Sequence, residues 1–320
     1  MQKAQVTLGI DIGGTNTVFG LIGEDGKQYY HNSVKTEADR DPELLFNKIY
    51  DHVNSFVENS EMDLLGIGVG APNANYYTNK IENAVNLSWG TVNVVNILSK
   101  LFDTPAFITN DANAAALGEK QFGEAEGMED FIEITLGTGL GSGIVVNGEL
   151  VYGHDGFAGE LGHIKVIENG RECGCGNRGC LETYASATGL VRTTLEFLSK
   201  FKSESELRDI PPNKLTSKKV YKYAQKGDKI AQQAFSETGR ILGRALANFV
   251  AALSPEAIIL YGGLANANDL IVGPVKEALE KNVMSTFKNK VDILISGLPE
   301  DKAAVMGTAG LAWHEIQKEN

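Results

Sequence analysis

Three cysteines lie close together in the sequence, and the chain has no others. Cys173, Cys175 and Cys180 fall within the segment RECGCGNRGCLE of a 320-residue protein. An odd count of clustered thiols does not suit a disulfide framework, so a metal is the natural alternative. His163, which taken alone would be a hydrogen-bonded core histidine, adds a fourth ligand of the kind that tetrahedral zinc takes. Four protein ligands would close the coordination sphere, so we expect a structural zinc that fixes the loop carrying Glu182.

A second group with possible chemistry follows the expected strand 106–111. Asp111 stands where this strand ends and a helix begins, at the sheet edge where ligands of α/β proteins collect. A helix N-cap is the local alternative, and the two roles are compatible. A carboxylate there could accept a hydroxyl proton during in-line attack on a phosphate. Asn110, Glu160 and Glu182 add donors and acceptors that suit a ring of hydroxyl groups, although a lone loop glutamate is more often merely solvated.

Glycine-rich turns follow two apolar strands. The segments DIGGTN and GTGLGSG lie in hairpins, and neither fits the P-loop nor the dinucleotide fingerprint. Each turn taken alone is explained by the tight turn itself. Two such hairpins, however, would expose backbone N–H groups that could hold one polyphosphate from opposite sides. The glycines concerned are Gly13, Gly14, Gly137, Gly139 and Gly141.

The elements that must position these residues repeat along the chain. Strand 6–10, a turn and strand 17–22 are matched later by strand 131–136, a turn and strand 144–146. The alternation of strands and helices between and after them predicts an α/β protein with layered packing. The other expected elements are helices at 42–58, 112–122, 228–253 and 302–318, and strands at 64–70, 256–261 and 291–297.

For two further segments we predict structure but assign no chemical role. Helix 228–253 is expected to begin at the N-cap Asp228 and to carry small residues four apart, which would suit a helix clamped between lobes. The polar segment 203–219 contains a Pro pair and is predicted to be a surface loop or an insertion. The small residues are Gly239, Gly243, Ala247 and Ala251.

Length and charge exclude several classes of function. A chain of 320 residues predicts two lobes. The formal net charge of −12, without a long basic run, argues against nucleic acid and anionic membranes as partners. The sequence shows neither a signal peptide nor an apolar stretch long enough to span a bilayer, so a cytoplasmic protein is predicted.

Four motifs together resemble the ROK family of sugar kinases and sugar-responsive repressors. They are GIDIGGTN, TLGTGLGSGIV, GELGH and CGCGNRGCLE, and the likeness runs from Val6 to the last helix and is greatest to the glucokinases of the family. The resemblance implies the actin-like ATPase (ribonuclease H-like) fold, an α/β fold whose two lobes are built from duplicated βββαβα units. The smaller lobe would comprise 1–109 with the C-terminal helix at about 306–320, and the larger lobe 110–305 with the zinc-binding loop.

The resemblance also implies an activity and a set of site residues. The activity is phosphorylation of a hexose 6-hydroxyl by ATP and Mg²⁺, with glucose as the leading substrate and Asp111 as the catalytic base. Asp11 would lie near Mg²⁺ through water, and Asn73 stands where the family more commonly has Gly, so contacts near C2 to C4 of the sugar are not predicted. The implied sugar ligands are Asn86, Asn110, Asp111, Glu160, His163 and Glu182, and the implied nucleotide ligands are Asp11, Gly13, Gly14, Thr15, Asn16, Thr138, Gly139, Gly262 and Gly263.

Alternatives from other classes remain. A sugar-sensing repressor of the same family would need a DNA-binding extension, and only five residues precede Val6. A polymerising or chaperone-like ATPase would keep the glycine hairpins without needing Asn110, Glu160 and Glu182. Within the kinases, N-acetylmannosamine, N-acetylglucosamine and fructose are competing acceptors, and polyphosphate is a competing donor. The family resemblance further implies a homodimer.

Overall fold

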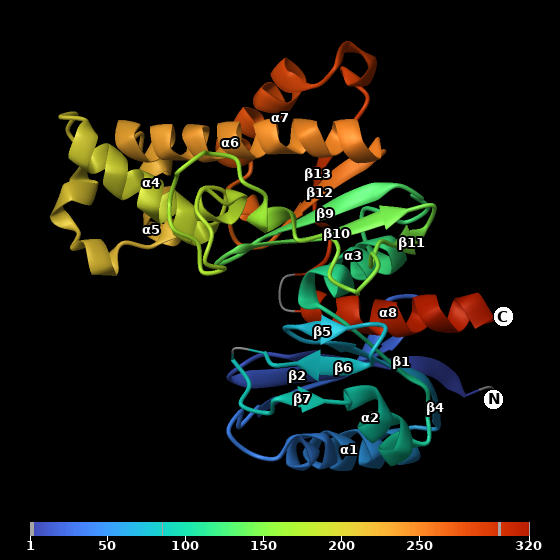
Figure 1. Ribbon diagram of the computed structural model, residues 1–320. Coiled ribbons are helices and arrows are strands. Elements are labelled where there is room, and N and C mark those ends of the chain that lie inside the picture. Colours follow the sequence, from blue (N-terminus) through green and yellow to red (C-terminus); the bar gives the residue numbers. More distant parts are fainter. Residues whose placement is uncertain (1–2, 85, 300–301, 320) are drawn as a thin grey trace.

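Two five-stranded sheets carry the glycine-rich turns, one in each lobe of the molecule (Figure 1). The structure is a computed structural model and describes residues 3–84, 86–299 and 302–319. The first sheet has the order β3 (Gln28–Lys35), β2 (Asn16–Gly23), β1 (Ala4–Ile12), β4 (Met62–Gly70) and β8 (Ala106–Thr109). The second has the order β11 (Glu149–Leu150), β10 (Leu140–Val146), β9 (Phe131–Leu136), β12 (Ala257–Tyr261) and β13 (Asp292–Ile295).

The two sheets share one topology. In each, the first strand in the sequence lies in the centre, with antiparallel hairpin strands on one side and parallel strands on the other. The expected duplication and the two-lobed α/β fold are therefore confirmed. A third sheet, which the sequence did not predict, extends from the first lobe and consists of β5 (Ala74–Asn75), β6 (Lys80–Glu82) and β7 (Thr91–Val92).

Helices cover both faces of the two large sheets, which explains why the central strands read as continuous apolar runs. Asp228 caps the long helix as expected, because its carboxylate accepts the backbone N–H of Ala231 at 3.0 Å. No helix that the structure describes is long and apolar enough to cross a membrane. The α-helices are α1 (Pro42–Asn59), α2 (Val94–Phe102), α3 (Asp111–Phe122), α4 (Ala187–Lys200), α5 (Ser217–Gln225), α6 (Lys229–Leu253), α7 (Asp269–Asn282) and α8 (Ala303–Glu319). The 3₁₀-helices are η1 (Leu161–His163), η2 (Leu181–Thr183), η3 (Glu206–Asp209), η4 (Pro212–Lys214), η5 (Ala265–Ala267) and η6 (Ser285–Phe287).

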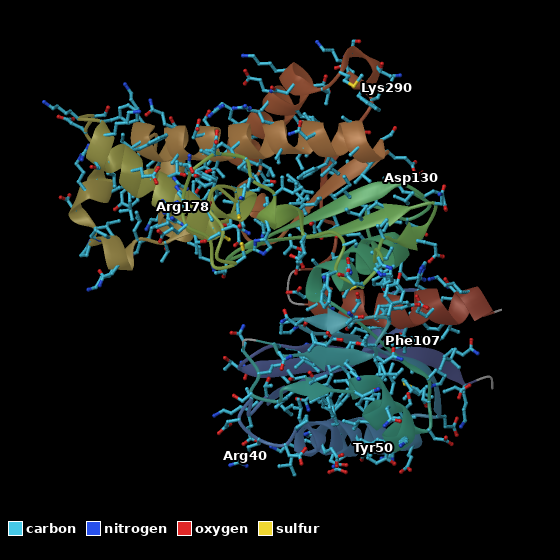
Figure 2. The ribbon with its side chains drawn as sticks, viewed as in Figure 1. Arg40, Tyr50, Phe107, Asp130, Arg178 and Lys290 are labelled. Carbon is cyan, nitrogen blue, oxygen red and sulfur yellow. The ribbon has the colours of Figure 1, made fainter. Side chains whose placement is uncertain are left out.

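Side chains fill the space on both faces of the first sheet (Figure 2). Phe107 of β8 packs with the cluster that includes Leu311 of α8. On the opposite face, Tyr50 of α1 meets Phe102 of α2 edge to face, with ring centroids 5.0 Å apart. The first sheet is therefore a middle layer between α1 and α2 on one side and α8 on the other.

Helices α3 and α8 lie between the lobes (Figure 1), and glycines determine how closely their backbones approach. A Cβ atom at Gly118 of α3 would lie 2.8 Å from the Cα of Gly307 in α8. A Cβ atom at Gly68 of β4 would lie 1.8 Å from the carbonyl oxygen of Thr308. Because any side chain at these positions would push the backbones apart, this contact admits only glycine.

The small residues of α6 serve a different contact from the one expected. Gly239 and Gly243 face α7, where added Cβ atoms would lie 2.9 Å from the carbonyl oxygen of Ile271 and 2.3 Å from that of Val275. Both helices belong to the lobe of the second sheet (Figure 1). A closely approaching backbone was predicted and is present, but the placement of α6 between the lobes is wrong.

The segment 203–219 is also more ordered than its polar composition predicted. It forms η3, η4 and the first turn of α5, and Leu207 is fully buried while Leu215 is 7% exposed. Asp228 accepts a hydrogen bond from the Ser205 hydroxyl at 2.6 Å, which ties the segment to the start of α6. The segment lies at the surface as predicted, since most of its residues are exposed, but it is ordered, because two leucines anchor it in the core.

Gly68→Ala tests the contact between β4 and α8. The added methyl group would meet a backbone carbonyl that cannot rotate away, so we expect the free energy of unfolding to fall by about 3 kcal/mol. Urea denaturation of the purified variant measures this. Gly273→Ala is the matched control, since open space surrounds that Cβ position, and it should change the free energy by less than about 1 kcal/mol. Equal stability of the two variants would contradict the proposed contact.

Candidate active site

A cavity of about 490 Å³ opens between the two sheets, at the N-terminus of α3. The first sheet contributes Asp11, α3 contributes Asp111, and α8 contributes Thr308. The turn between β9 and β10 forms the opposite wall, with Glu182 beside it. Of the predicted site residues, the cavity brings together Asp11, Asp111, Thr138, Gly139 and Glu182.

Asp111 is the exposed first residue of α3, and its neighbour is the helix cap. The Asn110 side-chain oxygen accepts the backbone N–H of Asn113 at 2.7 Å, which makes Asn110 the N-cap. Asp111 accepts only the N–H of Ala112, at 2.9 Å from one carboxylate oxygen. The capping alternative considered for Asp111 therefore applies to Asn110 instead. The Asp111 side chain lines the cavity, and the Asn110 amide N–H₂ is not used in the cap, which takes only the side-chain oxygen.

Asp11 ends the central run of β1, opposite Val18 of β2. Burial, and to a smaller extent the nearby charge of Asp111, raises the pKa of its carboxyl group to about 6. Two carboxylates that share one cavity repel each other, and a bound cation would relieve this repulsion. The pair thus fits a site for a divalent ion that arrives with phosphates.

The first glycine hairpin is fixed by a hydrogen bond from Thr36. The N–H of Gly13 donates to the Asn16 carbonyl at 3.1 Å, and the Thr36 hydroxyl donates to the Gly13 carbonyl at 2.6 Å. A Cβ atom at Gly14 would lie 2.9 Å from the Cβ of Asn86, so the predicted sugar loop packs directly on this hairpin. Among the described residues that line the cavity, only Asp11 comes from this part of the chain; Gly13, Gly14, Thr15, Asn16 and Asn86 lie outside its wall.

The second hairpin is joined to the start of α4. The N–H of Ala187 donates to the Gly137 carbonyl at 2.9 Å, and the Thr188 hydroxyl donates to the Thr138 carbonyl at 2.7 Å. These bonds direct the hairpin carbonyls away from the cavity. A Cβ atom at Gly139 would lie 2.6 Å from a carboxylate oxygen of Glu182, so this glycine is required for the two to meet.

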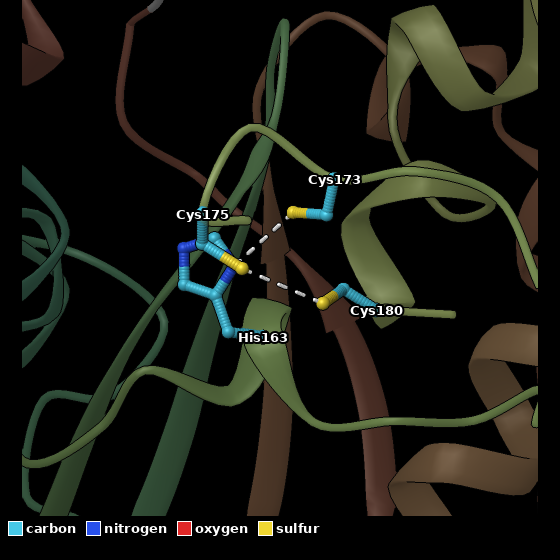
Figure 3. A group of neighbouring side chains, drawn as sticks. All are labelled: His163, Cys173, Cys175 and Cys180. Atoms are coloured by element: carbon cyan, nitrogen blue, oxygen red, sulfur yellow. Dashed lines mark hydrogen bonds between the residues drawn. The ribbon is translucent and has the colours of Figure 1, made fainter. Parts of the chain in front are cut away.

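His163, Cys173, Cys175 and Cys180 meet as the sequence predicted (Figure 3). Their ligand atoms all lie within 4.8 Å of one another. The sulfur atoms of Cys175 and Cys180 are 3.7 Å apart, and the Cys173 sulfur is 3.6 Å from His163 Nδ1. Tetrahedral zinc with Zn–S bonds of about 2.3 Å needs separations of about 3.8 Å between sulfur atoms. The donor set and its spacing therefore fit zinc.

The loop that holds the thiols is braced by two arginines. Arg171 has a buried guanidinium that donates to the Thr183 carbonyl at 2.7 Å and pairs with Glu196 at 2.8 Å. Arg178, which is labelled in Figure 2, pairs with Glu172 at 2.9 Å within the loop. Cys180 leads directly into η2, which carries Glu182. A fixed loop therefore means a fixed Glu182.

His163 lies between the thiols and two acidic side chains. Its Nδ1 is 3.7 Å from Glu182 Oε1 and faces the cysteines, while its Nε2 is 3.8 Å from Glu160 Oε2. Burial raises the pKa of Glu160, His163 opposes this shift, and the charges of Asp111 and Glu182 add to it. The two ring nitrogens thus have separate neighbours, which permits one to bind a metal while the other meets a ligand.

A second cavity, of about 330 Å³, adjoins the two glycines after β12. Gly263 lines this second cavity, whereas Tyr261, two residues earlier, lines the first cavity. The chain therefore passes from one cavity to the next at the end of β12, and we call them the two consecutive cavities. Gly262 has a φ of 95° and turns the chain against the carbonyl of Leu136. The rest of this wall was not predicted from the sequence, because it brings together α5, α6 and residues 264–267, which lie apart in the chain. The missed lining residues include Ser217, Lys218, Tyr221 and Asn266.

The backbone conformation and hydrogen bonds of Asn73 explain why asparagine is present where glycine is more common. Its φ of 53° is left-handed, a conformation that asparagine tolerates better than most residues. Its side-chain amide donates to the carbonyls of Glu82 and Asn83 at 3.2 and 3.4 Å. The loop is joined to the other lobe by Asn75, which donates to the Asp155 carbonyl at 2.7 Å. Asparagine therefore provides the turn and also holds the strand that leads to the sugar loop.

Comparisons with known proteins agree with this geometry. A model of the ROK family matches residues 7–315. A glucokinase of Halalkalibacterium halodurans is 35% identical over 319 residues, covering 98% of this chain and 96% of its own. The crystal structure of a ROK family glucokinase from Streptomyces griseus in complex with glucose and AMPPNP matches with a TM-score of 0.76 at 31% identity, over 96% of this chain and 99% of that chain. A xylose repressor of Bacillus subtilis is 28% identical over 95% of this chain and 76% of its own length.

Proposed function

The chain belongs to the ROK family, and we propose that it transfers the γ-phosphate of ATP to the 6-hydroxyl of a hexose, with glucose as the substrate. One observation carries this proposal. The exposed carboxylate of Asp111 shares a cavity with the hairpin at Thr138 and Gly139 and with the acidic side chain of Glu182. A base, a phosphate-binding turn and a hydroxyl acceptor in one cavity are the parts that an in-line transfer requires.

Asp111 is the proposed catalytic base. Its free carboxylate oxygen would accept the proton of the attacking hydroxyl as the bond to phosphorus forms. The bond from Ala112 N–H to the other oxygen holds the carboxylate at the first turn of α3. Capping by Asn110 leaves Asp111 free for this role.

The sugar would lie between the two loops that converge on Asp111. Glu160 and Glu182 supply acceptors and His163 supplies Nε2 on one side. Asn110 and Asn86 supply amide groups from the other side. Asn86 packs against Gly14 and does not line the cavity. Its contact with a sugar in the cavity would therefore require the lobes to come closer.

ATP would span the two cavities. The backbone N–H groups of the second hairpin would hold its phosphates, and Gly13, Gly14, Thr15 and Asn16 would meet them from the first hairpin. Gly262, Gly263 and the cavity beside them would take the adenosine, with Tyr221 and Asn266 available for the base. Asp11 would hold Mg²⁺ through water, and this ion would neutralise the developing phosphate charge.

The four-ligand cluster is the proposed site of a structural zinc. Its ligands would be His163 through Nδ1 and the three thiolates, all of which are free cysteines. Its role would be to fix the loop that carries Glu182, since Cys180 immediately precedes η2. Three reduced thiols and an ATP donor also suit the proposed cytoplasmic location. The homodimer implied by the family stays a prediction, and size-exclusion chromatography with light scattering tests it.

Release of ADP with Mg-ATP across a panel of sugars tests the activity. The panel contains glucose, mannose, fructose, N-acetylglucosamine and N-acetylmannosamine, with a reaction that lacks sugar as the control. We expect turnover with glucose to exceed that with the other sugars and with no sugar. Preference for an amino sugar would change the substrate and leave the mechanism, whereas turnover independent of sugar would contradict a sugar kinase.

Asp111→Asn tests the base. The amide keeps the shape and the hydrogen bonds of the carboxylate but cannot take a proton, so kcat should fall by about 10²- to 10⁴-fold. Glucose affinity, measured by calorimetry without nucleotide, should stay within a few-fold of the parent, or about 1 kcal/mol. Asp63→Asn, at the exposed far end of β4, is the matched control. Turnover near that of the parent in Asp111→Asn would remove Asp111 from the chemistry.

Cys175→Ser tests the zinc. Mass spectrometry of the metal content should find one zinc per chain in the parent and little in the variant, and the melting temperature should fall because metal binding is coupled to folding. Glu168→Gln changes an exposed side chain of the same loop without changing a ligand or the Arg178–Glu172 pair, and it should retain the metal. Active parent protein that holds no zinc would contradict the site.

A further inference from the structure

Glu133 is a carboxylic acid buried completely beneath the catalytic cavity. It lies in the middle of β9 and is 0% exposed. It pairs with Gly143 of β10, and a Cβ atom at Gly143 would lie 2.5 Å from the Cβ of Ala116 in α3. Side chains that pair across antiparallel strands lie on the same face of the sheet. Glu133 therefore faces α3, the helix that begins with Asp111.

Thr135 connects this buried acid to the cavity. It lies two residues further along β9 and so on the same face of the sheet. Its hydroxyl oxygen is 3.0 and 3.2 Å from the two carboxyl oxygens of Glu133. Thr135 also lines the cavity that holds Asp11 and Asp111. One hydroxyl group thus separates Glu133 from the proposed phosphate site.

The surroundings of Glu133 favour its neutral form. The charged groups that act on it, Glu119 and Asp111 of α3, are both acidic. Burial is the main cause that raises the pKa of Glu133 well above its ordinary value, and these two carboxylates add to it. The hydrogen bond from Thr135 is the opposing influence. An ionised carboxylate without a cation would be far more costly to bury than the acid.

The protonation state of Glu133 decides what Thr135 presents to the cavity. A hydroxyl group has one proton to donate and can also accept. If Glu133 were ionised, the Thr135 proton would point at it and leave oxygen lone pairs towards the phosphates. If Glu133 is protonated, it donates to the Thr135 oxygen, and the Thr135 proton is free to point into the cavity.

We propose that Glu133 is a positioning residue that, as a neutral acid, donates to the Thr135 oxygen and thereby directs the Thr135 hydroxyl at a phosphate oxygen of the bound nucleotide. The inference rests on the proposed function, because it takes the cavity to hold the phosphates of ATP. Glu133 itself touches no substrate. Its contribution passes through Thr135, and it concerns the nucleotide and not the sugar.

Conservative and apolar substitutions distinguish a neutral donor from an ionised acceptor. Glu133→Gln keeps a donor of similar shape, so kcat and the KM for ATP should stay within about two- to three-fold of the parent, since the hydrogen bond survives. Glu133→Met removes the donor, and Thr135→Val removes the hydroxyl. Each should lower kcat/KM for ATP by about tenfold, the scale of one hydrogen bond to a charged group. Glucose affinity measured without nucleotide should be unchanged in all three variants.

The outcomes separate this inference from the proposed function. A Gln variant as impaired as the Met variant would mean that the ionised form is needed, and it would overturn the inference. Met and Val variants with parental ATP kinetics would overturn it also. Should Glu133→Met fail to fold, the Gln and Val variants decide the question by the same criteria. A parent enzyme that turns over no sugar would refute the proposed function and this inference with it, whereas an active parent with unaffected variants would refute the inference alone.

Discussion

The site depends on the close approach of two helix backbones, α3 and α8, between the lobes. Glycine at positions 118 and 307 lets these backbones meet, and glycine at position 68 lets α8 rest on the first sheet. The same helices reach the cavity, since α3 begins with Asp111 and α8 contributes Thr308. The distance between the proposed base and the wall of the second sheet is therefore set by backbone contact, which deforms less readily than side-chain packing.

Acidic groups and their burial organise the chemistry around this contact. Asp11, Asp111, Glu160 and Glu182 lie near one another, and Glu133 lies beneath them. Burial, with mutual repulsion added to it, raises the pKa values of Asp11, Glu133 and Glu160, while Asp111 stays exposed at the first turn of α3. The proposed magnesium would add positive charge to this group, whereas zinc bound by three thiolates and a neutral imidazole would carry a net charge of about −1. Magnesium is therefore the ion that would offset the carboxylates when the nucleotide binds.

Local patterns in the sequence predicted much of this arrangement. They could not predict contacts between segments that are distant in the chain. The cysteine cluster and the duplicated hairpins were predictable because their residues are close in sequence or repeat. The contact of Gly118 with Gly307 joins segments far apart in the chain, so no periodicity indicates it. The N-cap at Asn110 could not be distinguished from one at Asp111, because both residue types cap helices.

The missed features follow from the same limit. The polar composition of 203–219 concealed Leu207 and Leu215, which are buried and anchor the segment that leads to Ser217 and Lys218 at a cavity wall. Glu133 was visible as one charged residue within an apolar strand, the signal that could have identified it. Its significance required knowing that Gly143 lies opposite it and that α3 covers both.

The two consecutive cavities have a consequence for how such a protein can diversify. The wall beside Gly263 includes residues of α5, α6 and η5, whereas the wall beside Asp111 includes residues of the two sheets, α3, α8 and η2. Substitutions in α5 can therefore alter one cavity while the central scaffold stays as it is. Because the proposed ATP would span both cavities while the sugar would meet only the first, selection on the part of the donor that enters the second cavity would act on a separate stretch of the chain from selection on the acceptor.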